Sequence, residues 1–185
     1  MSRRGAERPV RVSRFLARHL RHAPEAIGIT LDGAGWAEVD ALLAAAARAG
    51  FPISREELDA AVHAPGKRRY VLDASGARIR AAQGHSVAVD LGLDPVPPPA
   101  ELFHGTHAGV VEAILREGLE PMGRLQVHLS SDRDTAVAVG ARRGRPVVLV
   151  VDAAGLAATG VPFRLAENGV WLVDRVPPDY VRRDG

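Results

Sequence analysis

The chain has 185 residues and the composition of a folded protein. Its 46% hydrophobic and 25% charged residues exclude wholesale disorder and a fibrous repeat. No stretch approaches the roughly 18 uncharged apolar residues of a membrane helix, and no apolar secretory core follows the arginine-rich start, so we expect a cytoplasmic protein without membrane contact. The lack of cysteine excludes a disulfide scaffold, an iron–sulfur cluster, a thiolate nucleophile and a cysteine-ligated zinc site.

The basic residues are almost all arginines. Lys67 is the single lysine among 24 basic residues, against 22 acidic ones. Codon use in a GC-rich genome is one explanation. Anion binding is the other, because a guanidinium group presents a planar fork of donors that matches phosphate oxygens. The net charge of +2 does not decide between them, so the clustering of the arginines must.

Helical spacing marks the first sixty residues. Apolar residues recur at this spacing over residues 12–20. Pro24 disfavours the helical conformation of the residue before it, so the first predicted helix ends near His22. The same spacing over residues 36–46 predicts a second helix, and a capping box at residues 54–57 opens a third. Residues 69–80 have the pattern of a β-hairpin with a glycine-containing turn. Three helices ahead of the first strand and its hairpin predict a winged-helix unit.

A proline-rich segment follows. Prolines lack the backbone donor that helices and central strands need, so residues 93–101 are predicted to be a linker. The chain is therefore predicted to have a first lobe over residues 1–92 and a second over residues 102–185.

The second lobe alternates short apolar runs with amphipathic stretches. The runs predict strands and the stretches predict helices that end at glycines, so this lobe should be mixed and the fold class of the chain α+β. The expected strands lie at 102–103, 127–129, 147–151 and 170–173, and the expected helices at 110–115 and 135–139.

Four arginines share one face of the first predicted helix. Arg11, Arg14, Arg18 and Arg21 are spaced by three, four and three residues, opposite the apolar stripe. A solvated face is the ordinary explanation of such a run. No acidic residue interrupts this one, however, and Arg21 and His22 end the helix, where the dipole stabilises cations. A bound polyanion would relieve the repulsion among these charges.

A second basic group lies on the hairpin, with Lys67, Arg68 and Arg69 before one strand and Arg78 and Arg80 on the other. Alternation along a strand places the last two on one face. A basic hairpin beside a basic helix is typical of nucleic-acid binding, and the 4% aromatic content favours phosphate contacts over base stacking.

Three polar motifs stand out beyond these arginines. Gln83-Gly-His-Ser86 follows the hairpin, His104-Gly-Thr106 ends a predicted strand, and His128 lies on another. Taken singly, the first motif fits an ordinary polar turn, and the histidines fit core positions where the ring nitrogens have hydrogen-bond partners. No two histidines have the helical spacing of a zinc site, so we expect no metal.

Taken together, the motifs resemble those of one known family, in the same order and over nearly the whole chain. The chain is similar to the NAD⁺-dependent tRNA 2′-phosphotransferases. The resemblance implies that the first lobe is a winged-helix, RNA-binding lobe and the second an ADP-ribosyltransferase-like, NAD-binding lobe. The motifs that carry it are Leu20-Arg-His22, Gly35-Trp36, Arg78-Ile-Arg80, Gln83-Gly-His-Ser86, His104-Gly-Thr106, Arg124 with Val127-His-Leu-Ser130, and Asn168-Gly-Val-Trp-Leu172.

The resemblance also implies residue roles. Arg14 stands where the family often has lysine, and Gln126 where many members have a second histidine. Arg68 is an alternative to Arg69, because the register of that loop is not fixed by a strong motif. The implied catalytic residues are Arg21, His22, Arg69 and Arg124; the implied NAD⁺ contacts are His104, Gly105, Thr106, His128 and Ser130; and the implied RNA or phosphate contacts are Ser13, Arg14, Arg18, Arg80, Gln83, His85 and Ser86.

The implied reaction has two steps and requires no metal. An RNA 2′-phosphate attacks the ribose carbon that carries nicotinamide and expels nicotinamide. The neighbouring ribose hydroxyl then attacks that phosphate, which releases RNA with a 2′-hydroxyl and ADP-ribose 1″,2″-cyclic phosphate. We therefore expect NAD as co-substrate, RNA with a 2′-phosphate as partner, and a monomer.

Two other functions stay open. A winged-helix regulator could sense NAD⁺ without turnover, and would release no nicotinamide. An ADP-ribosyltransferase could act on protein or on nucleic-acid phosphate ends. Protein-modifying enzymes of that type commonly use a glutamate against the ribose, and Glu167 is the only acid beside the Asn168 motif, in an expected turn.

Overall fold

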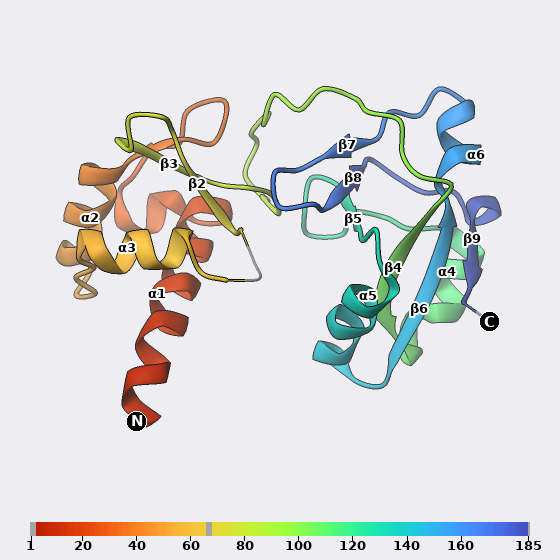
Figure 1. Cartoon of the computed structure of the whole chain (residues 1–185), viewed down its shortest axis with the longest axis horizontal. Coiled ribbons are helices and arrows are strands. Elements are labelled where there is room, and N and C mark those ends of the chain that lie inside the picture. The colour runs from red at the N-terminus through yellow and green to blue at the C-terminus, as the bar shows by residue number, and fades with distance from the viewer. Residues whose placement is uncertain (1–2, 66–67, 185) are drawn as a thin grey trace. The chain divides into compact units, whose positions relative to one another are not determined.

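The computed structural model describes residues 3–65 and 68–184, which form two compact units (Figure 1). The first unit is Met1–Gly92 and the second is Leu93–Gly185. Lys67, one of the basic residues noted beside the hairpin, lies outside the described residues. Within the described part of the chain, no helix combines the length and the apolar character needed to cross a membrane.

The described residues of the first unit form three α-helices and a small antiparallel sheet. The three predicted helices and the predicted hairpin are confirmed. The expectation that no strand precedes the hairpin is wrong. Ala37 pairs with Ile79, and this pairing holds the backbone just before the second helix in an extended conformation. The strand order of the sheet is β1-β3-β2. The elements are α1 (Arg3–Arg21), a 3-10 turn (Pro24–Ile27), β1 (Ala37–Glu38), α2 (Val39–Arg48), α3 (Arg55–Val62), β2 (Tyr70–Leu72) and β3 (Arg78–Ala81).

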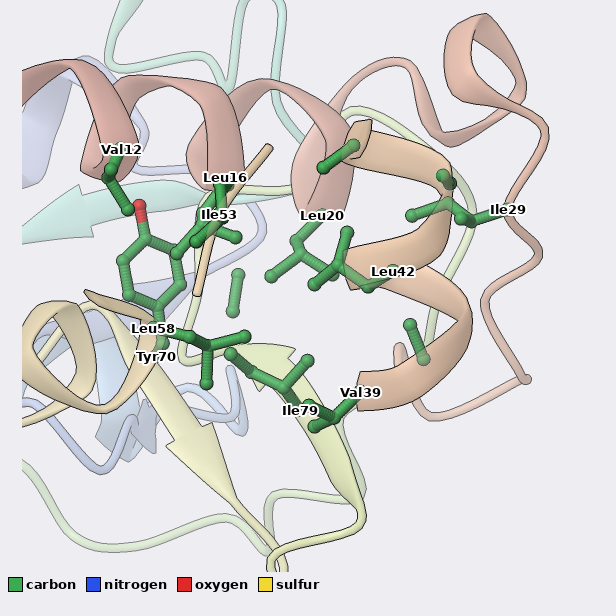
Figure 2. Packing of buried hydrophobic residues seen from close by; sticks show 14 residues of the cluster. Val12, Leu16, Leu20, Ile29, Val39, Leu42, Ile53, Leu58, Tyr70 and Ile79 are labelled. Atoms are coloured by element: carbon green, nitrogen blue, oxygen red, sulfur yellow. The ribbon is translucent and has the colours of Figure 1, made fainter. Parts of the chain in front are cut away.

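The core of the first unit forms under α1. Figure 2 shows that Val12, Leu16 and Leu20 point from this helix toward side chains of α2, α3 and the sheet. All three are at most 1% exposed, as the spacing of the apolar residues requires. The Tyr70 ring lies in the same core with its hydroxyl turned toward α1, where it donates a hydrogen bond to the carbonyl oxygen of Ser13. The hairpin is thereby fixed to the middle of α1.

A capping box and an ion pair join α3 to α1. Ser54 Oγ accepts from the Glu57 amide at 3.2 Å, and Glu57 Oε2 accepts from the Ser54 amide at 3.1 Å. The Arg8 guanidinium donates to both Glu57 carboxylate oxygens, at 2.7 and 3.0 Å. The bond from Arg8 and then the Ser54 amide lower the pKa of Glu57 to about 2.

This depressed pKa predicts an acid-sensitive contribution to stability. The pKa of Glu57 in the folded protein lies below the usual value of about 4.3. The ionised carboxylate therefore stabilises the fold at pH values above about 4.3, and this stabilisation is lost as the pH falls toward 2. A Glu57→Gln protein should therefore lose less stability than the parent between about pH 5 and pH 2, as measured by urea unfolding. Arg8→Ala and the double variant complete the cycle, and acid curves of the same shape for all four proteins would contradict the assignment.

The second unit is mixed α+β, as predicted. All four predicted strands and both predicted helices are present; α6, β7 and β9 were not predicted. Its two small antiparallel sheets have the orders β4-β6-β9 and β5-β8-β7. The elements are β4 (Glu101–His107), α4 (Val111–Glu117), β5 (Val127–Leu129), α5 (Arg133–Gly140), β6 (Pro146–Asp152), α6 (Ala153–Ala158), β7 (Arg164–Leu165), β8 (Trp171–Val173) and β9 (Val181–Arg183), with 3-10 turns at Ala108–Val110, Ala141–Arg143 and Pro178–Tyr180.

The long strands β4 and β6 run side by side in the second unit (Figure 1). Phe103 and Ser130 exchange two backbone hydrogen bonds of 2.8 Å, which connect the β4 sheet to the end of β5. The polar ends of β4 and β5 are thus held next to one another.

The proline-rich segment is attached to the second unit. Pro95 forms a bridge with Arg164, and the Val96 amide donates to the Phe163 carbonyl oxygen.

Candidate functional site

Two polar segments of the first unit meet at the end of α1. We call this the α1-end cluster: Arg21, His22, Arg69, Arg80, Gln83, His85 and Ser86. The Ser86 amide donates to the Arg21 carbonyl oxygen at 2.9 Å, and His22 Nδ1 lies 3.0 Å from Ser86 Oγ. The structure therefore brings together two motifs that are more than sixty residues apart in sequence.

Arg21 is half-buried against the loop that carries Ser86. Gly84 has a φ of +88°, and a Cβ at that position would lie 3.5 Å from Nη1 of Arg21. Arg21 Nη2 also donates to the Arg69 carbonyl oxygen at 3.4 Å, and Arg69 Nη1 reaches Ser13 Oγ at 3.5 Å. Arg68 is exposed. Arg69 thus contacts the cluster through its backbone carbonyl oxygen, and its guanidinium group lies at Ser13.

His85 is buried within the cluster, with 3% of its surface exposed. Burial, and then the positive charges of Arg21, His22 and Arg80, lower the pKa of His85 to about 4, so its imidazole is neutral at neutral pH. The charges that act on it are all positive. Neither His85 Nε2 nor Gln83 Oε1 has a hydrogen-bond partner among the residues that the structure describes. An electropositive site of this kind favours an anionic ligand.

The exposed face of α1 extends this positive surface. Arg11, Arg14 and Arg18 are exposed, as the predicted stripe requires. Arg11 lies over the Phe51 ring, 5.3 Å from its centroid. Arg14 and Arg18 take part in no ion pair with any described residue. These two guanidinium groups are available for an external anion.

The hairpin is less basic than its sequence predicts. Arg78 and Arg80 share a face, as predicted, and both lie over the Trp36 ring, at 5.5 and 4.6 Å from its centroid. Arg78 pairs with Asp73 at 3.3 Å and with Asp32 at 3.8 Å. Arg80 donates to the Leu91 carbonyl oxygen at 3.2 Å. The acidic partners of Arg78 reduce the positive character of the hairpin, so α1 carries most of the basic surface.

A second polar cluster lies where β4 and β5 adjoin in the second unit. We call it the β4–β5 cluster: His104, Gly105, Thr106, His128 and Ser130, with Arg124 in the loop before β5. His104 Nδ1 lies 3.2 Å from the carbonyl oxygen of His128. Because a carbonyl oxygen only accepts, Nδ1 carries the proton, and Nε2 of the neutral ring is an acceptor.

Burial lowers the pKa of His104; the hydrogen bond to the His128 carbonyl opposes this shift, and the Arg124 charge adds to it. Arg124 follows Met122, whose φ of 58° is uncommon for a residue other than glycine. At the other end of this turn, Gln126 Nε2 donates to Asp174 Oδ1 at 2.8 Å, next to the β5–β8 pairing. The loop thus places the Arg124 charge within electrostatic reach of His104.

The glycine of the His104-Gly-Thr106 motif permits a close approach of α5 to β4. A Cβ on Gly105 would lie 1.8 Å from the Ala136 carbonyl oxygen, and one on Gly140 would lie 2.4 Å from the Thr106 carbonyl oxygen. Helix and strand therefore touch backbone to backbone at two residues of the motif, Gly105 and Thr106. This contact fixes the positions of His104 and Thr106.

Several residues that shape these clusters were not predicted from the sequence. Tyr70 secures Ser13, Gly84 supplies a backbone φ of +88° beside the Arg21 side chain, and Asp174 holds Gln126. Only Gly84, inside the Gln83–Ser86 motif, gave a local signal. In the described ranges 3–65 and 68–184, no group of three or more histidine, aspartate or glutamate side chains could hold a metal ion.

Comparisons with known proteins cover nearly the whole chain. A profile described as "RNA 2′-phosphotransferase, Tpt1/KptA family" matches residues 7–175. A protein of Streptomyces coelicolor named "Probable RNA 2′-phosphotransferase" is 57% identical over 176 residues, which cover 95% of this chain and 96% of that protein. Proteins of the same name from Agrobacterium fabrum and Pseudomonas aeruginosa are 57% and 51% identical and cover 91% and 92% of this chain, and 91% and 94% of their own lengths. The chain therefore belongs to the RNA 2′-phosphotransferase, Tpt1/KptA, family.

Proposed function

We propose that this protein is an NAD-dependent RNA 2′-phosphotransferase that acts as a cytoplasmic monomer. The α1-end cluster carries the proposal, because Arg21, His22 and Arg80 gather positive charge near the buried His85, which suits a phosphate. The exposed arginines of α1 extend this positive surface. Three helices with a three-stranded antiparallel sheet support a winged-helix, RNA-binding first unit. The mixed second unit, with its two small antiparallel sheets, supports an ADP-ribosyltransferase-like lobe that binds NAD⁺.

The β4–β5 cluster has the chemistry expected of a dinucleotide site. His104 presents a neutral ring whose Nε2 accepts hydrogen bonds. Thr106 in β4 and Ser130, which follows β5 and bridges to Phe103, supply hydroxyl groups. Uncharged donors and acceptors of this kind suit ribose hydroxyls and a carboxamide, while Arg124 suits a phosphate. We assign NAD⁺ binding to His104, Gly105, Thr106, His128 and Ser130.

In the first step, Arg21 and Arg69 hold the RNA 2′-phosphate while one of its oxygens bonds to the ribose carbon of NAD⁺. The bond from that carbon to nicotinamide breaks, and nicotinamide leaves with the electron pair. Arginine serves this step chiefly by positioning an anionic nucleophile. The intermediate is RNA with ADP-ribose attached to its 2′-phosphate.

In the second step, the adjacent ribose hydroxyl attacks phosphorus and the bond from phosphorus to the RNA 2′-oxygen breaks. The hydroxyl proton ends on that RNA oxygen, and His22 is the titratable group we assign to its transfer. Guanidinium donors then stabilise the charge that grows on the equatorial phosphate oxygens. The products are RNA with a 2′-hydroxyl and ADP-ribose 1″,2″-cyclic phosphate.

The decisive experiment incubates the whole protein with NAD⁺ and one of four substrates: 2′-phosphorylated RNA, the same RNA without the phosphate, 5′-phosphorylated RNA, or a protein mixture. We expect nicotinamide release and 2′-hydroxyl RNA with the first substrate. NAD⁺ binding without release would favour the NAD-sensing regulator. Label transfer to protein or to RNA ends alone would favour an ADP-ribosyltransferase, with Glu167 as its candidate acid, although that side chain is exposed.

RNA affinity should depend on the exposed arginines of α1. Replacing Arg14 and Arg18 with alanine should weaken binding of 2′-phosphorylated RNA and reduce the slope of log affinity against log salt by about 0.7 for each RNA phosphate that the variant no longer neutralises. Fluorescence anisotropy across a salt series measures this slope. Arg48→Ala removes an exposed arginine from α2 in the same unit and is the matched control. Equal slopes for all the variants and the parent would exclude this face of α1.

A further inference from the structure

We propose that Ser86 is a positioning residue for His22. Its hydroxyl oxygen accepts a hydrogen bond from Nδ1–H of the imidazole and donates its own proton to the carbonyl oxygen of Arg21, so that Nε2 is the nitrogen presented to the substrate. The proposal rests on the function proposed above. It gives Ser86 a role other than the RNA contact that the resemblance implies.

Two distances carry the proposal. Ser86 Oγ lies 3.0 Å from His22 Nδ1 and 3.5 Å from the Arg21 carbonyl oxygen. The carbonyl oxygen can only accept, so the hydroxyl proton is the donor of the longer bond. A lone pair of Oγ then accepts from Nδ1–H. The carbonyl oxygen of Arg21 accepts this hydroxyl bond in addition to two backbone amide bonds, and the hydroxyl bond is the longest of the three.

The loop that carries Ser86 is held in place on both sides. The amides of Ser86 and Val87 donate to the same Arg21 carbonyl oxygen, at 2.9 and 3.3 Å. The preceding His85 is buried, and Gly84 has a backbone conformation that other residues rarely adopt. The Ser86 hydroxyl is therefore fixed relative to the backbone of residue 21, beside the side chain it contacts.

His22 needs such a contact because it lies just beyond α1. Its amide still bonds to the Arg18 carbonyl oxygen at 3.0 Å, which fixes the backbone. Its imidazole is exposed, however, and an exposed side chain exchanges rotamers within nanoseconds unless something holds it. The bond to Ser86 selects one ring orientation and one tautomer. When His22 is charged, the same arrangement leaves Nε2–H as a donor toward an anion.

The tautomer is measurable without any reaction. Nitrogen-15 spectra of the imidazoles, recorded on the whole protein where His22 is neutral and assigned with a His22→Gln protein, should show the proton on Nδ1. The Ser86→Ala protein should show both tautomers at His22, and Ser86→Thr should restore the parent spectrum because threonine keeps the hydroxyl. A proton on Nε2 in the parent, or an unchanged His22 spectrum in Ser86→Ala, overturns the proposal.

Kinetics separate positioning from RNA binding. With NAD⁺ and 2′-phosphorylated RNA, Ser86→Ala should lower kcat on the order of 10- to 100-fold, as a misplaced catalytic group does, with KM for RNA unchanged. Ser86→Thr should recover most of kcat. Ser75→Ala, which removes a hydroxyl bonded to Asp73 in the exposed turn of the hairpin, is the matched control and should behave as the parent.

The two measurements distinguish a failure of the Ser86 proposal from a failure of the proposed function. A raised KM with an unchanged kcat would assign Ser86 to direct RNA contact and overturn its positioning role. If the parent releases no nicotinamide, the proposed function fails, while the nitrogen-15 spectra still decide whether Ser86 fixes the His22 ring.

Discussion

A Gly105→Ala protein should lose about 3 kcal/mol or more of the stability of its second unit. The added methyl group would lie 1.8 Å from the Ala136 carbonyl oxygen, and this atom belongs to the backbone of α5. A flexible side chain could move aside, but here the helix itself would have to shift. A Cβ on Gly140, at the end of the same helix, would lie 2.4 Å from the Thr106 carbonyl oxygen, so α5 is packed backbone to backbone against β4 at a second point as well.

Urea unfolding can measure this loss for the second unit alone. The two tryptophans, Trp36 and Trp171, lie in different units, so a Trp36→Phe background leaves fluorescence that reports only on the second. Gly123→Ala is the matched control, since a Cβ there meets nothing within 4 Å and its φ is not positive, and its change should stay within about 0.5 kcal/mol. Equal stability of the two alanine variants would show that α5 can retreat from β4.

The long elements of this fold could be predicted because their signals are local. The apolar spacing of α1 and the capping box of α3 act within a few residues of where they are encoded. The missed strands have two or three residues each: β1, β7 and β9 are extended because a partner strand pairs with them. No local pattern contains that partner, and propensity over two residues is too weak to decide.

The residue types of the candidate site were predictable, but their arrangement was not. Motifs pointed to His22 and Ser86, yet the 3.0 Å contact between them depends on how the loop folds against α1. The positive charge of the hairpin is smaller than its sequence indicates, because the pairing of Arg78 with Asp32 and Asp73 follows from the turn geometry. Gly105 belongs to a predicted binding motif, and the structure shows in addition that α5 requires a residue without a side chain there.

Replacing Arg124 with alanine should cause RNA that carries ADP-ribose on its 2′-phosphate to accumulate. In the first step nicotinamide departs from an oxocarbenium-like ribose while the attacking phosphate loses negative charge, so an arginine contributes positioning more than transition-state stabilisation. The second step passes through a crowded phosphorane-like state with more charge on the equatorial oxygens. Loss of one preorganised donor there costs on the order of 10²–10³ in rate. Arg69→Ala should have the same effect.

Single-turnover reactions with labelled RNA, resolved on a denaturing gel, would show the intermediate as a slower band that the parent protein barely populates. Arg116→Ala is the control, because this exposed arginine on α4 pairs only with the neighbouring Glu117 among the described ion pairs. Nicotinamide release should stay close to the parent rate in Arg124→Ala while formation of 2′-hydroxyl RNA falls. If release and product formation slow equally in Arg124→Ala and Arg69→Ala, with no slower band, these arginines do not act in the second step, and they serve only to position the phosphate for the first.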